Sequence, residues 1–347
     1  MDRARRDWLQ GLRARHAADG SSASALELAR GEWRCGDYAD ARTHFESAVA
    51  LAPGSAEARV ALLNALSMLG LFDRHAEVLA DALQRMPREP MVQFHAARSE
   101  VPGDLAAARE RLRPFDDIPL LAQYARALGA ILAGTIPLEQ NGDGDDYAMA
   151  RQEALRWVLR HSSSPSIHTG HPARVLERAL ELAPAEGLTL ECGVYFGRSL
   201  DIIARHVPDE VHGFDSFQGL PEAWTEHEGA GAYTTAGRLP AVPGHVRLHA
   251  GWFEETLPAF LQAHPGPIGL LHVDCDLYSS TRTVLELAAP RLQAGSIVVF
   301  DDLLAFPGYE RHELRAFQEH CQATGMRWEI VAACLLGREV AFRVLPG

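Results

Sequence analysis

The stretch LECGVYFGRS, residues 190–199, decides the fold. It has the pattern of a buried strand that ends in a glycine-spaced turn and then opens a helix over residues 199–205. Gly193 and Gly197 allow the backbone to turn sharply and to approach a ligand closely. A turn of this kind, at the C-terminal end of a strand, is where open α/β sheets bind nucleotides. The spacing is Gly-x-x-x-Gly, not the Gly-x-Gly-x-x-Gly of dinucleotide sites, so a purely structural turn remains an alternative.

A carboxylate follows the next strand along the chain. Residues 210–214 (EVHGF) are typical of a core strand, and Asp215 comes directly after them. An acidic residue about 20 positions past the glycine turn is placed to accept hydrogen bonds from ribose hydroxyls. The alternative is a solvated loop aspartate.

Two later strands also end in acidic residues. Residues 267–273 (PIGLLHV) lead into Asp274-Cys275-Asp276, and residues 296–300 (SIVVF) lead into Asp301-Asp302. Nearly continuous apolar runs are typical of strands covered on both faces, as in a parallel sheet. Their carboxylates then converge at one edge, which is costly unless a cation, a proton or a substrate hydroxyl balances the charge. The pattern favours magnesium there, with capping of the following helices as the alternative for some of the aspartates.

These residues carry a family resemblance. The chain resembles the macrocin O-methyltransferase family, a branch of the class I S-adenosylmethionine-dependent methyltransferases. The resemblance covers about residues 190–305 and implies an α/β, Rossmann-like sheet of seven strands. The matching segments, in the order of the family, are residues 191–199 (ECGVYFGRS), 214–221 (FDSFQGLP), 251–258 (GWFEETLP), 272–281 (HVDCDLYSST) and 298–302 (VVFDD).

The resemblance also implies a chemistry and a set of site residues. It implies S-adenosylmethionine as methyl donor, magnesium, and methylation of a hydroxyl, largely on sugars of natural products. The metal ligands are expected at Asp274, Asp301 and Asp302, with Asp276 in reserve. Residues expected to hold or shape the donor site are Glu191, Gly193, Tyr195, Gly197, Ser199, Asp215, Ser216, Gly251, Trp252 and Phe253.

Catalytic residues are harder to assign from the pattern. Asp274 is a candidate because its cation would stabilise the developing alkoxide of the acceptor. His272, in the strand just before Asp274, is a further candidate, and Tyr278 and His312 are others because they lie where loops could reach the acceptor. A core histidine is the alternative for His272, and the general base is left open.

The N-terminal third has the pattern of a helical repeat. Gly36, Ala48 and Pro53 recur 34 residues later as glycine, alanine and proline, which is the period of tetratricopeptide repeats. Small residues at helix contacts, glycine at the turn and proline after the helix suit closely packed helix pairs. A weaker third copy is expected over residues 103–112. Such a module binds a protein or a carrier, associates with itself, or packs on the enzyme, and the pattern does not choose among these.

A polar segment, residues 140–146 (QNGDGDD), is the expected linker. It divides the chain into an all-α domain over residues 1–140 and a methyltransferase domain over residues 141–347. Helices are expected over residues 120–132, 147–161, 172–182, 199–206, 255–263, 281–291 and 309–324. Residues 327–333 and 339–345 are expected to close the sheet as an antiparallel hairpin.

Composition favours a cytoplasmic protein of two domains. The chain has 347 residues, a net charge of −13 and five scattered cysteines. Scattered cysteines favour free thiols, and the acidic balance disfavours nucleic acid as a partner. We expect no membrane partner, because no apolar run is long enough to span a bilayer. The expected partners are a small-molecule or saccharide acceptor and, through the repeats, a protein, a carrier or a second copy.

Two other functions fit the sequence less well. An inert scaffold would lack an intact donor turn or acidic cluster, and both are present in the sequence. A nicotinamide-dependent oxidoreductase would share the sheet, but its glycine spacing and the acidic pair after the fifth strand fit less well.

Overall fold

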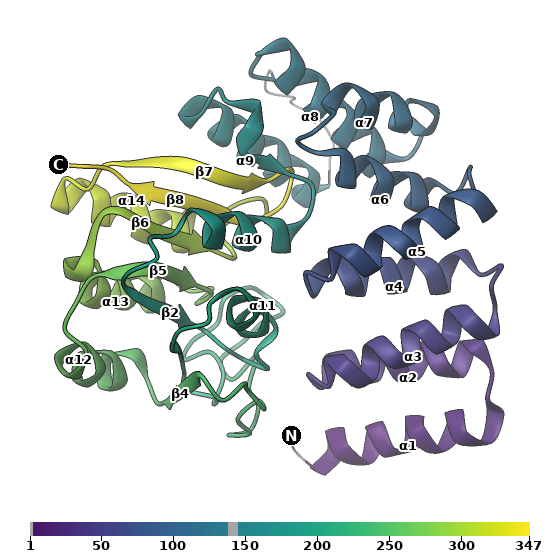
Figure 1. Ribbon diagram of the computed structural model, residues 1–347, viewed down its shortest axis with the longest axis horizontal. Helices are drawn as coiled ribbons and strands as arrows, with labels where there is room; N and C mark the ends of the chain where they lie inside the picture. The colour runs from purple at the N-terminus through teal and green to yellow at the C-terminus, as the bar shows by residue number, and fades with distance from the viewer. Residues whose placement is uncertain (1–2, 138–144) are drawn as a thin grey trace.

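The computed structural model describes residues 3–137 and 145–347, which form a helical part and an α/β part lying against each other (Figure 1). The predicted boundary at residues 140 and 141, and most of the predicted linker, lie outside the described residues. The division into residues 1–140 and 141–347 therefore stays a prediction.

The helical part is a stack of antiparallel helices. Its core consists mainly of alanine and leucine, and Ala25, Ala41, Ala48 and Ala58 are fully buried at the helix contacts. Small residues let the helix axes approach closely. Over residues 3–137 the α-helices are α1 (Arg3–Asp19), α2 (Ser22–Arg34), α3 (Tyr38–Leu51), α4 (Ala56–Met68), α5 (Phe72–Arg85), α6 (Pro90–Glu100), α7 (Leu105–Leu112) and α8 (Pro119–Ala133), with a 3₁₀ turn at Arg113–Phe115.

The α/β part is built on one mixed sheet. The strand order is β1-β7-β8-β6-β5-β2-β3-β4; β4, β3, β2, β5 and β6 run parallel, and β8 is antiparallel to both β6 and β7. The strands are β1 (His168–Thr169), β2 (Leu188–Cys192), β3 (Val211–Asp215), β4 (Val246–Ala250), β5 (Ile268–Val273), β6 (Leu292–Phe300), β7 (Trp328–Cys334) and β8 (Val340–Val344).

The predicted α/β class and the closing hairpin are confirmed, but the predicted strand number is not. Within the described residues the sheet has eight strands, because β1 pairs in parallel with the free edge of β7. This strand is only two residues long, and its isolated His168-Thr169 carries no alternating pattern by which the sequence would reveal it.

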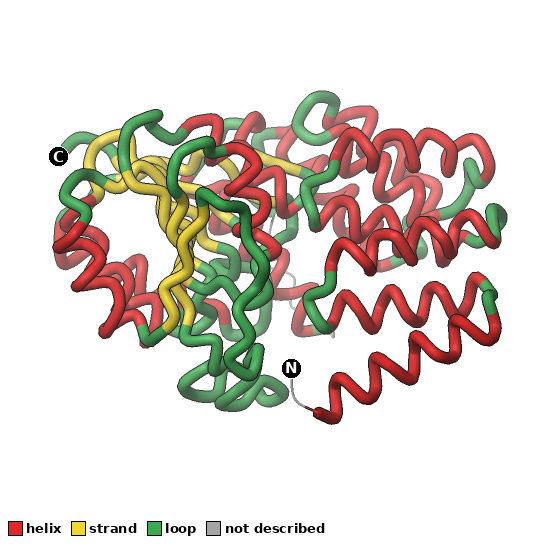
Figure 2. Tube along the Cα trace, turned by 60° about the horizontal axis from the view of Figure 1, so that its bottom comes forward, coloured by secondary structure: helices red, strands yellow, loops and turns green. Residues whose placement is uncertain are grey.

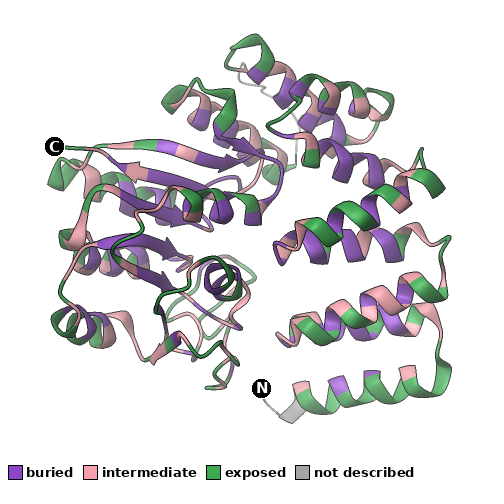
Figure 3. Cartoon of the chain, viewed as in Figure 1, coloured by how far each residue is buried: buried purple, intermediate pink, exposed green. Residues whose placement is uncertain are grey.

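Helices cover both faces of the sheet. One face is covered by α9 (Asp146–His161), α12 (Phe253–Ala263), α13 (Tyr278–Ala288) and α14 (Glu313–Thr324). The other face is covered by α10 (Pro172–Leu182) and α11 (Arg198–His206). The strands therefore form a buried layer between the two groups of helices (Figures 2 and 3). Three 3₁₀ turns lie at Pro165–Ile167, Ala289–Arg291 and Tyr309–Arg311. The last two replace the end of one predicted helix and the start of another.

The helical part meets the α/β part through the turns inside its repeats. Gly36, between α2 and α3, lies against the ring of Phe196, and Gly70, between α4 and α5, faces Ile202 of α11. These are the two glycines that mark the 34-residue period. The turns lie along the side of the helical stack that faces the sheet in Figure 1, so the repeats dock through an edge of the stack.

A second contact is a buried histidine cluster. Ser67 Oγ of α4 lies 2.7 Å from Nδ1 of His171, the residue before α10. The ring of His171 contacts His75 of α5 and stacks on His95 of α6. All three rings are buried. Burial lowers the pKa of His75 to about 4 and also lowers the pKa of His95 and of His171, with Arg98 adding to the effect.

Two further findings bear on the expectations from composition. All five cysteines, each within the described residues, are free thiols. Across residues 3–137 and 145–347, none of the helices combines the length and apolar character needed to cross a membrane.

Candidate functional site

A pocket of about 240 Å³ opens at the C-terminal ends of the parallel strands. Open α/β sheets bind their ligands at this edge. The predicted site residues that line it are Gly193, Tyr195, Asp215, Ser216, Gly251, Trp252, Phe253, Asp274, Asp301 and Asp302. The structure thus brings residues from four strand ends and from the segment after β4 around one cavity.

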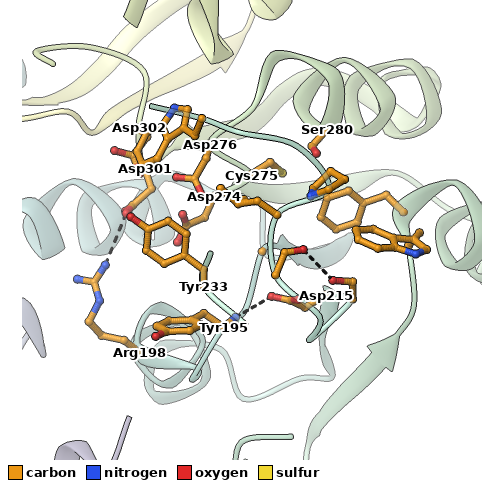
Figure 4. A pocket seen from close by; sticks show the side chains of 18 of the residues that line it. Tyr195, Arg198, Asp215, Tyr233, Asp274, Cys275, Asp276, Ser280, Asp301 and Asp302 are labelled. Carbon is orange, nitrogen blue, oxygen red and sulfur yellow. Dashed lines mark hydrogen bonds and ion pairs between the residues drawn. The ribbon is translucent and has the colours of Figure 1, made fainter. Parts of the chain in front are cut away.

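The glycine turn after β2 needs its first glycine. Gly193 has a φ of +99°, and a Cβ built on it would lie 2.6 Å from the carbonyl carbon of Asp274. The end of β2 can therefore approach the end of β5 only without a side chain. Tyr195, two residues on, has a φ of +51°, a strained conformation for a non-glycine residue. Its ring lines the pocket beside Arg198 (Figure 4).

Asp215 organises the backbone of this turn. Its Oδ2 accepts hydrogen bonds from the amides of Val194 and Tyr195, both at 2.8 Å, and its Oδ1 accepts one from the amide of Phe217 at 2.6 Å. The carboxylate joins the turn after β2 to the loop after β3. Because Oδ2 already accepts two amides, Oδ1 is the oxygen that keeps a lone pair for a further donor from the pocket.

An acidic group lies across the pocket from Asp215 (Figure 4). Carboxylate oxygens of Asp274, Asp276 and Asp302 come within 4.8 Å of one another. Burial, followed by neighbouring carboxylates, raises the pKa of Asp274 and of Asp276 well above that of an ordinary aspartate. Burial also raises the pKa of Asp302, although Arg338 opposes the shift. These oxygen donors, crowded at an open pocket, fit a hard divalent cation.

Asp301 has different partners from its neighbours. Its Oδ2 lies 3.5 Å from Nη2 of Arg198, and its Oδ1 lies 3.8 Å from Nε2 of His272. Burial works to raise the pKa of Asp301, but His272 and Arg198 outweigh it and hold that pKa below the usual range. Asp301 is therefore ionised and paired with cations, whereas Asp276 takes the third place in the close carboxylate group.

His272 lies beneath the pocket, between two carboxylates. Its Nδ1 is 2.9 Å from Oε1 of Glu191, and its side chain is fully buried. Burial works to lower the pKa of His272, but Asp301 and Glu191 together raise it to about 10. The two carboxylates therefore favour the protonated form of this buried ring.

Five predicted site residues lie outside the pocket lining. Glu191 and Ser199 are buried behind it, and Gly197 lines a neighbouring cleft beside the repeats. Tyr278 is turned away, with its hydroxyl donating to Oε2 of Glu319 at 2.6 Å. The fold does not bring these four residues, or His272, to the lining of the cavity.

Other residues complete the site, although no pattern in the sequence marks them as site residues. Glu313, at the start of α14, is fully buried; its Oε1 accepts from the amide of Cys275 at 3.2 Å and its Oε2 from the amide of Asp302 at 3.3 Å. One carboxylate therefore ties the loops after β5 and β6 together. Arg338, from the β7–β8 turn, pairs with Asp302. Only the three-dimensional fold brings these distant positions to the acidic group.

The long loop between β3 and β4, residues 216–245, closes another side of the pocket. It contributes Trp224 and Tyr233, whose side chains line the cavity. Arg238 of the same loop donates to the carbonyl of Cys35 at 2.8 Å. Loops of this length in a compact domain are commonly functional. This one is held in place by the repeats.

Comparison with protein families supports both parts of the chain. Residues 190–303 match a family described as a methyltransferase domain, and residues 34–100 match a tetratricopeptide repeat. The first match contains the glycine turn, Asp215 and the acidic residues. The predicted recognition of both parts is confirmed.

Individual relatives were also found. A tetracenomycin-derivative 4'-O-methyltransferase of Streptomyces olivaceus, named for a substrate with a dimethoxyrhamnosyl group, is 32% identical over 156 residues, covering 37% of this chain and 58% of that protein. Demethyldecarbamoylnovobiocin O-methyltransferase of Streptomyces niveus is 37% identical over 62 residues, covering 18% of this chain and 22% of that protein. The chain thus spans less than two thirds of the length of these relatives.

Among solved structures, the calicheamicin methyltransferase CalS11 matches with a TM-score of 0.39 and 22% identity, covering 64% of this chain and 91% of that one. The assignment of the two parts rests on the family matches. The chain carries a methyltransferase domain over residues 190–303, preceded by a tetratricopeptide-repeat region over residues 34–100.

Proposed function

We propose that this chain is an S-adenosylmethionine-dependent, cation-assisted O-methyltransferase that acts on a hydroxyl of a saccharide or glycosylated natural product. The observation that carries the proposal is the pocket itself. It places Asp215 and the glycine turn on one side and a close group of carboxylates on the other, all within the matched methyltransferase domain. The hydroxyl and sugar classes come from the names of the Streptomyces relatives.

The donor would lie on the side of Asp215. The backbones of Gly193 and Gly251 line the pocket there, and Oδ1 of Asp215 has a lone pair for a ribose hydroxyl. Trp252 and Phe253, after β4, supply an apolar wall for a flat ring. When bound, S-adenosylmethionine supplies a methyl group on an electrophilic sulfonium. The role of the chain is to position it.

A divalent cation, magnesium in first place, would lie on the acidic side. Asp274 and Asp302 belong both to the predicted ligand set and to the close carboxylate group. The third ligand is Asp301 by resemblance and Asp276 by geometry. When bound, the cation supplies positive charge for a hydroxyl that is losing its proton. Glu313 and Arg338 hold the ligand loops and orient Asp302.

The acceptor would enter between the loop of residues 216–245 and the acidic group. Trp224 and Tyr233 offer ring faces there, and such faces suit the apolar side of a sugar ring. The ring of His272 lies between Glu191 and Asp301 and outside the cavity lining, which favours a positioning role over direct proton transfer. The repeats, which dock by an edge, would support the donor turn and this loop.

Transfer of a labelled methyl group tests the proposal. The chain, S-adenosylmethionine and a panel of glycosides with free sugar hydroxyls are incubated with and without magnesium, and labelled products are identified by mass. We expect transfer to a sugar oxygen, reduced on the order of 100-fold in Asp274→Asn. The matched control Asp117→Asn, an exposed aspartate of the helical part, retains activity. Equal transfer by Asp274→Asn would contradict the role of the acidic side.

A further inference from the structure

A second group of side chains of the types that bind metals lies at the β3–β4 side of the sheet, outside the pocket. Glu210 comes just before β3, His212 lies in β3, and His264 follows α12. One ligand atom from each of the three comes within 4.8 Å of the other two. None of these three side chains lines the cavity that holds Asp215 and the acidic group.

One pair of these atoms already has nearly the spacing of two ligands on one ion. Nε2 of His212 lies 3.6 Å from Oε2 of Glu210. A tetrahedral zinc ion, bound at about 2.0–2.2 Å by imidazole nitrogen and carboxylate oxygen, holds its ligand atoms roughly 3.3–3.5 Å apart. Because no separation in the group exceeds 4.8 Å, a shift of at most about 1.5 Å reaches this geometry.

Hydrogen bonds behind both histidines leave the correct nitrogens free. Nδ1 of His264 lies 3.0 Å from the carbonyl oxygen of Phe260, so it carries the proton and leaves the Nε2 lone pair exposed. Nδ1 of His212 lies 3.3 Å from Nε2 of His249, which serves as its acceptor. Metal-binding histidines in proteins almost always have such a partner on the second nitrogen.

The ligands are also fixed in place by packing. His212 is 3% exposed, and its ring lies against Phe260, which also stacks on His264. Nε of Arg247 lies 3.0 Å from Oε1 of Glu210 and orients the carboxylate while Oε2 stays free. Glu210 is exposed and His264 is partly exposed, so an ion can reach the group from solvent.

We propose that Glu210, His212 and His264 bind a divalent transition metal, zinc in first place, with water as the fourth ligand. Two imidazoles and one carboxylate favour zinc, nickel or copper over magnesium, which prefers oxygen ligands alone. Three protein ligands leave one open position, as in zinc sites that bind water. The ion joins the start of β3 to the end of α12. This site does not depend on the proposed methyl transfer.

Calorimetric titration with zinc tests the site on the full chain without a histidine tag, after treatment with chelator and with magnesium present to occupy the acidic group. We expect one zinc ion per chain at micromolar affinity or tighter, weakened at least about tenfold in Glu210→Gln and in His264→Gln. Both ligands are at least partly exposed, so these variants keep the fold, which circular dichroism verifies. The matched controls Asp209→Asn and His227→Gln, both exposed, keep the affinity of the wild type.

Cobalt replaces zinc in a second measurement. Tetrahedral cobalt has an intense visible absorption, which we expect in the wild type and in the two controls but not in the two ligand variants. Zinc binding of equal strength in wild type and both ligand variants, or no zinc binding by the folded wild type, would overturn the proposal.

Discussion

Phe196 of the glycine turn packs directly on Gly36 of the first repeat. A Cβ built on Gly36 would lie 2.6 Å from Cδ1 of the Phe196 ring and closer still to two other carbon atoms. Arg238 also lies over this ring, 5.2 Å from its centroid, and donates to the carbonyl of Cys35. The repeat turn, the donor turn and the loop that closes the pocket therefore meet at one point.

Replacing Gly36 by alanine tests this contact. The new methyl group overlaps the Phe196 ring, so we expect the helical part to be displaced and the affinity for S-adenosylhomocysteine to fall about tenfold or more. Gly36 also has a positive φ of +76°, which alanine tolerates poorly. Gly20→Ala is the matched control, because Gly20 has a φ of +60° but open space around its Cβ position. Calorimetry on both variants separates overlap from backbone strain, and equal affinities in the two would argue against the contact.

Glu313→Gln tests the carboxylate that joins the two acidic loops. Glutamine has one acceptor oxygen, so its NH₂ group must face the amide of Cys275 or of Asp302. We expect a loss of about 1–3 kcal/mol in the free energy of unfolding, since a buried hydrogen bond is replaced by two opposed donors. Stabilisation by added magnesium should also decrease. Urea unfolding with and without magnesium measures both, and Glu310→Gln, an exposed neighbour, serves as control. An unchanged magnesium effect in Glu313→Gln would show that the loops do not need this residue.

Asp276→Asn and Asp301→Asn distinguish the two candidates for the third cation ligand. The variant that removes a ligand loses affinity for magnesium, and a tenfold loss lowers the stabilisation by saturating magnesium by about 1.4 kcal/mol. The geometry predicts the larger loss in Asp276→Asn, because Asp301 is already paired with Arg198. Thermal unfolding over a series of magnesium concentrations gives both values. A larger loss in Asp301→Asn would return the third ligand to the position implied by the family resemblance.

The buried histidine cluster makes stability depend on pH. His75, His95 and His171 stay neutral in the folded chain because burial lowers the pKa of each, to about 4 for His75. In the unfolded chain a histidine has a pKa of about 6.5, so below that pH the unfolded state binds more protons. Stability is therefore fully present above about pH 6.5 and is lost as the pH falls towards 4, by up to about 1.4 kcal/mol per pH unit for each histidine.

Urea unfolding between about pH 7.5 and pH 5 measures this slope. His171→Asn removes one titrating ring from the cluster, so we expect its slope to be shallower by about one proton. His227→Gln, an exposed histidine, should leave the slope unchanged. A slope in His171→Asn equal to that of the wild type would contradict a neutral His171 in the folded chain.

Much of the fold could be predicted from the sequence because its signals are local. Apolar runs ending in Asp215, in Asp274 and in Asp301 mark three parallel strands, and the recurrence of Gly36 as Gly70 marks the repeats. The edge strand β1 was missed because two residues have no periodicity.

The site could be predicted only in part, because local sequence patterns mark only those of its residues that lie at strand ends. Strand ends place Asp274 and Asp302 correctly along the sheet edge, since parallel strands align their C-terminal ends. Glu313 and Arg338 reach the same place from α14 and from the β7–β8 turn, and nothing in their sequence surroundings indicates it. Tyr278 is near Asp274 in sequence, but its position in α13 turns it towards Glu319. Proximity in sequence does not give side-chain direction.

Binding of the donor product tests the central claim most directly. Calorimetric titration of the chain with S-adenosylhomocysteine, in the presence of magnesium, should give one site of micromolar affinity. Asp215→Ala should lower that affinity by more than about tenfold, because the variant loses both the carboxylate facing the pocket and the three amide contacts that shape the turn. Asp117→Asn should bind as the wild type does. No binding by the folded wild type, or equal binding by Asp215→Ala, would contradict a methyl-donor site in this pocket.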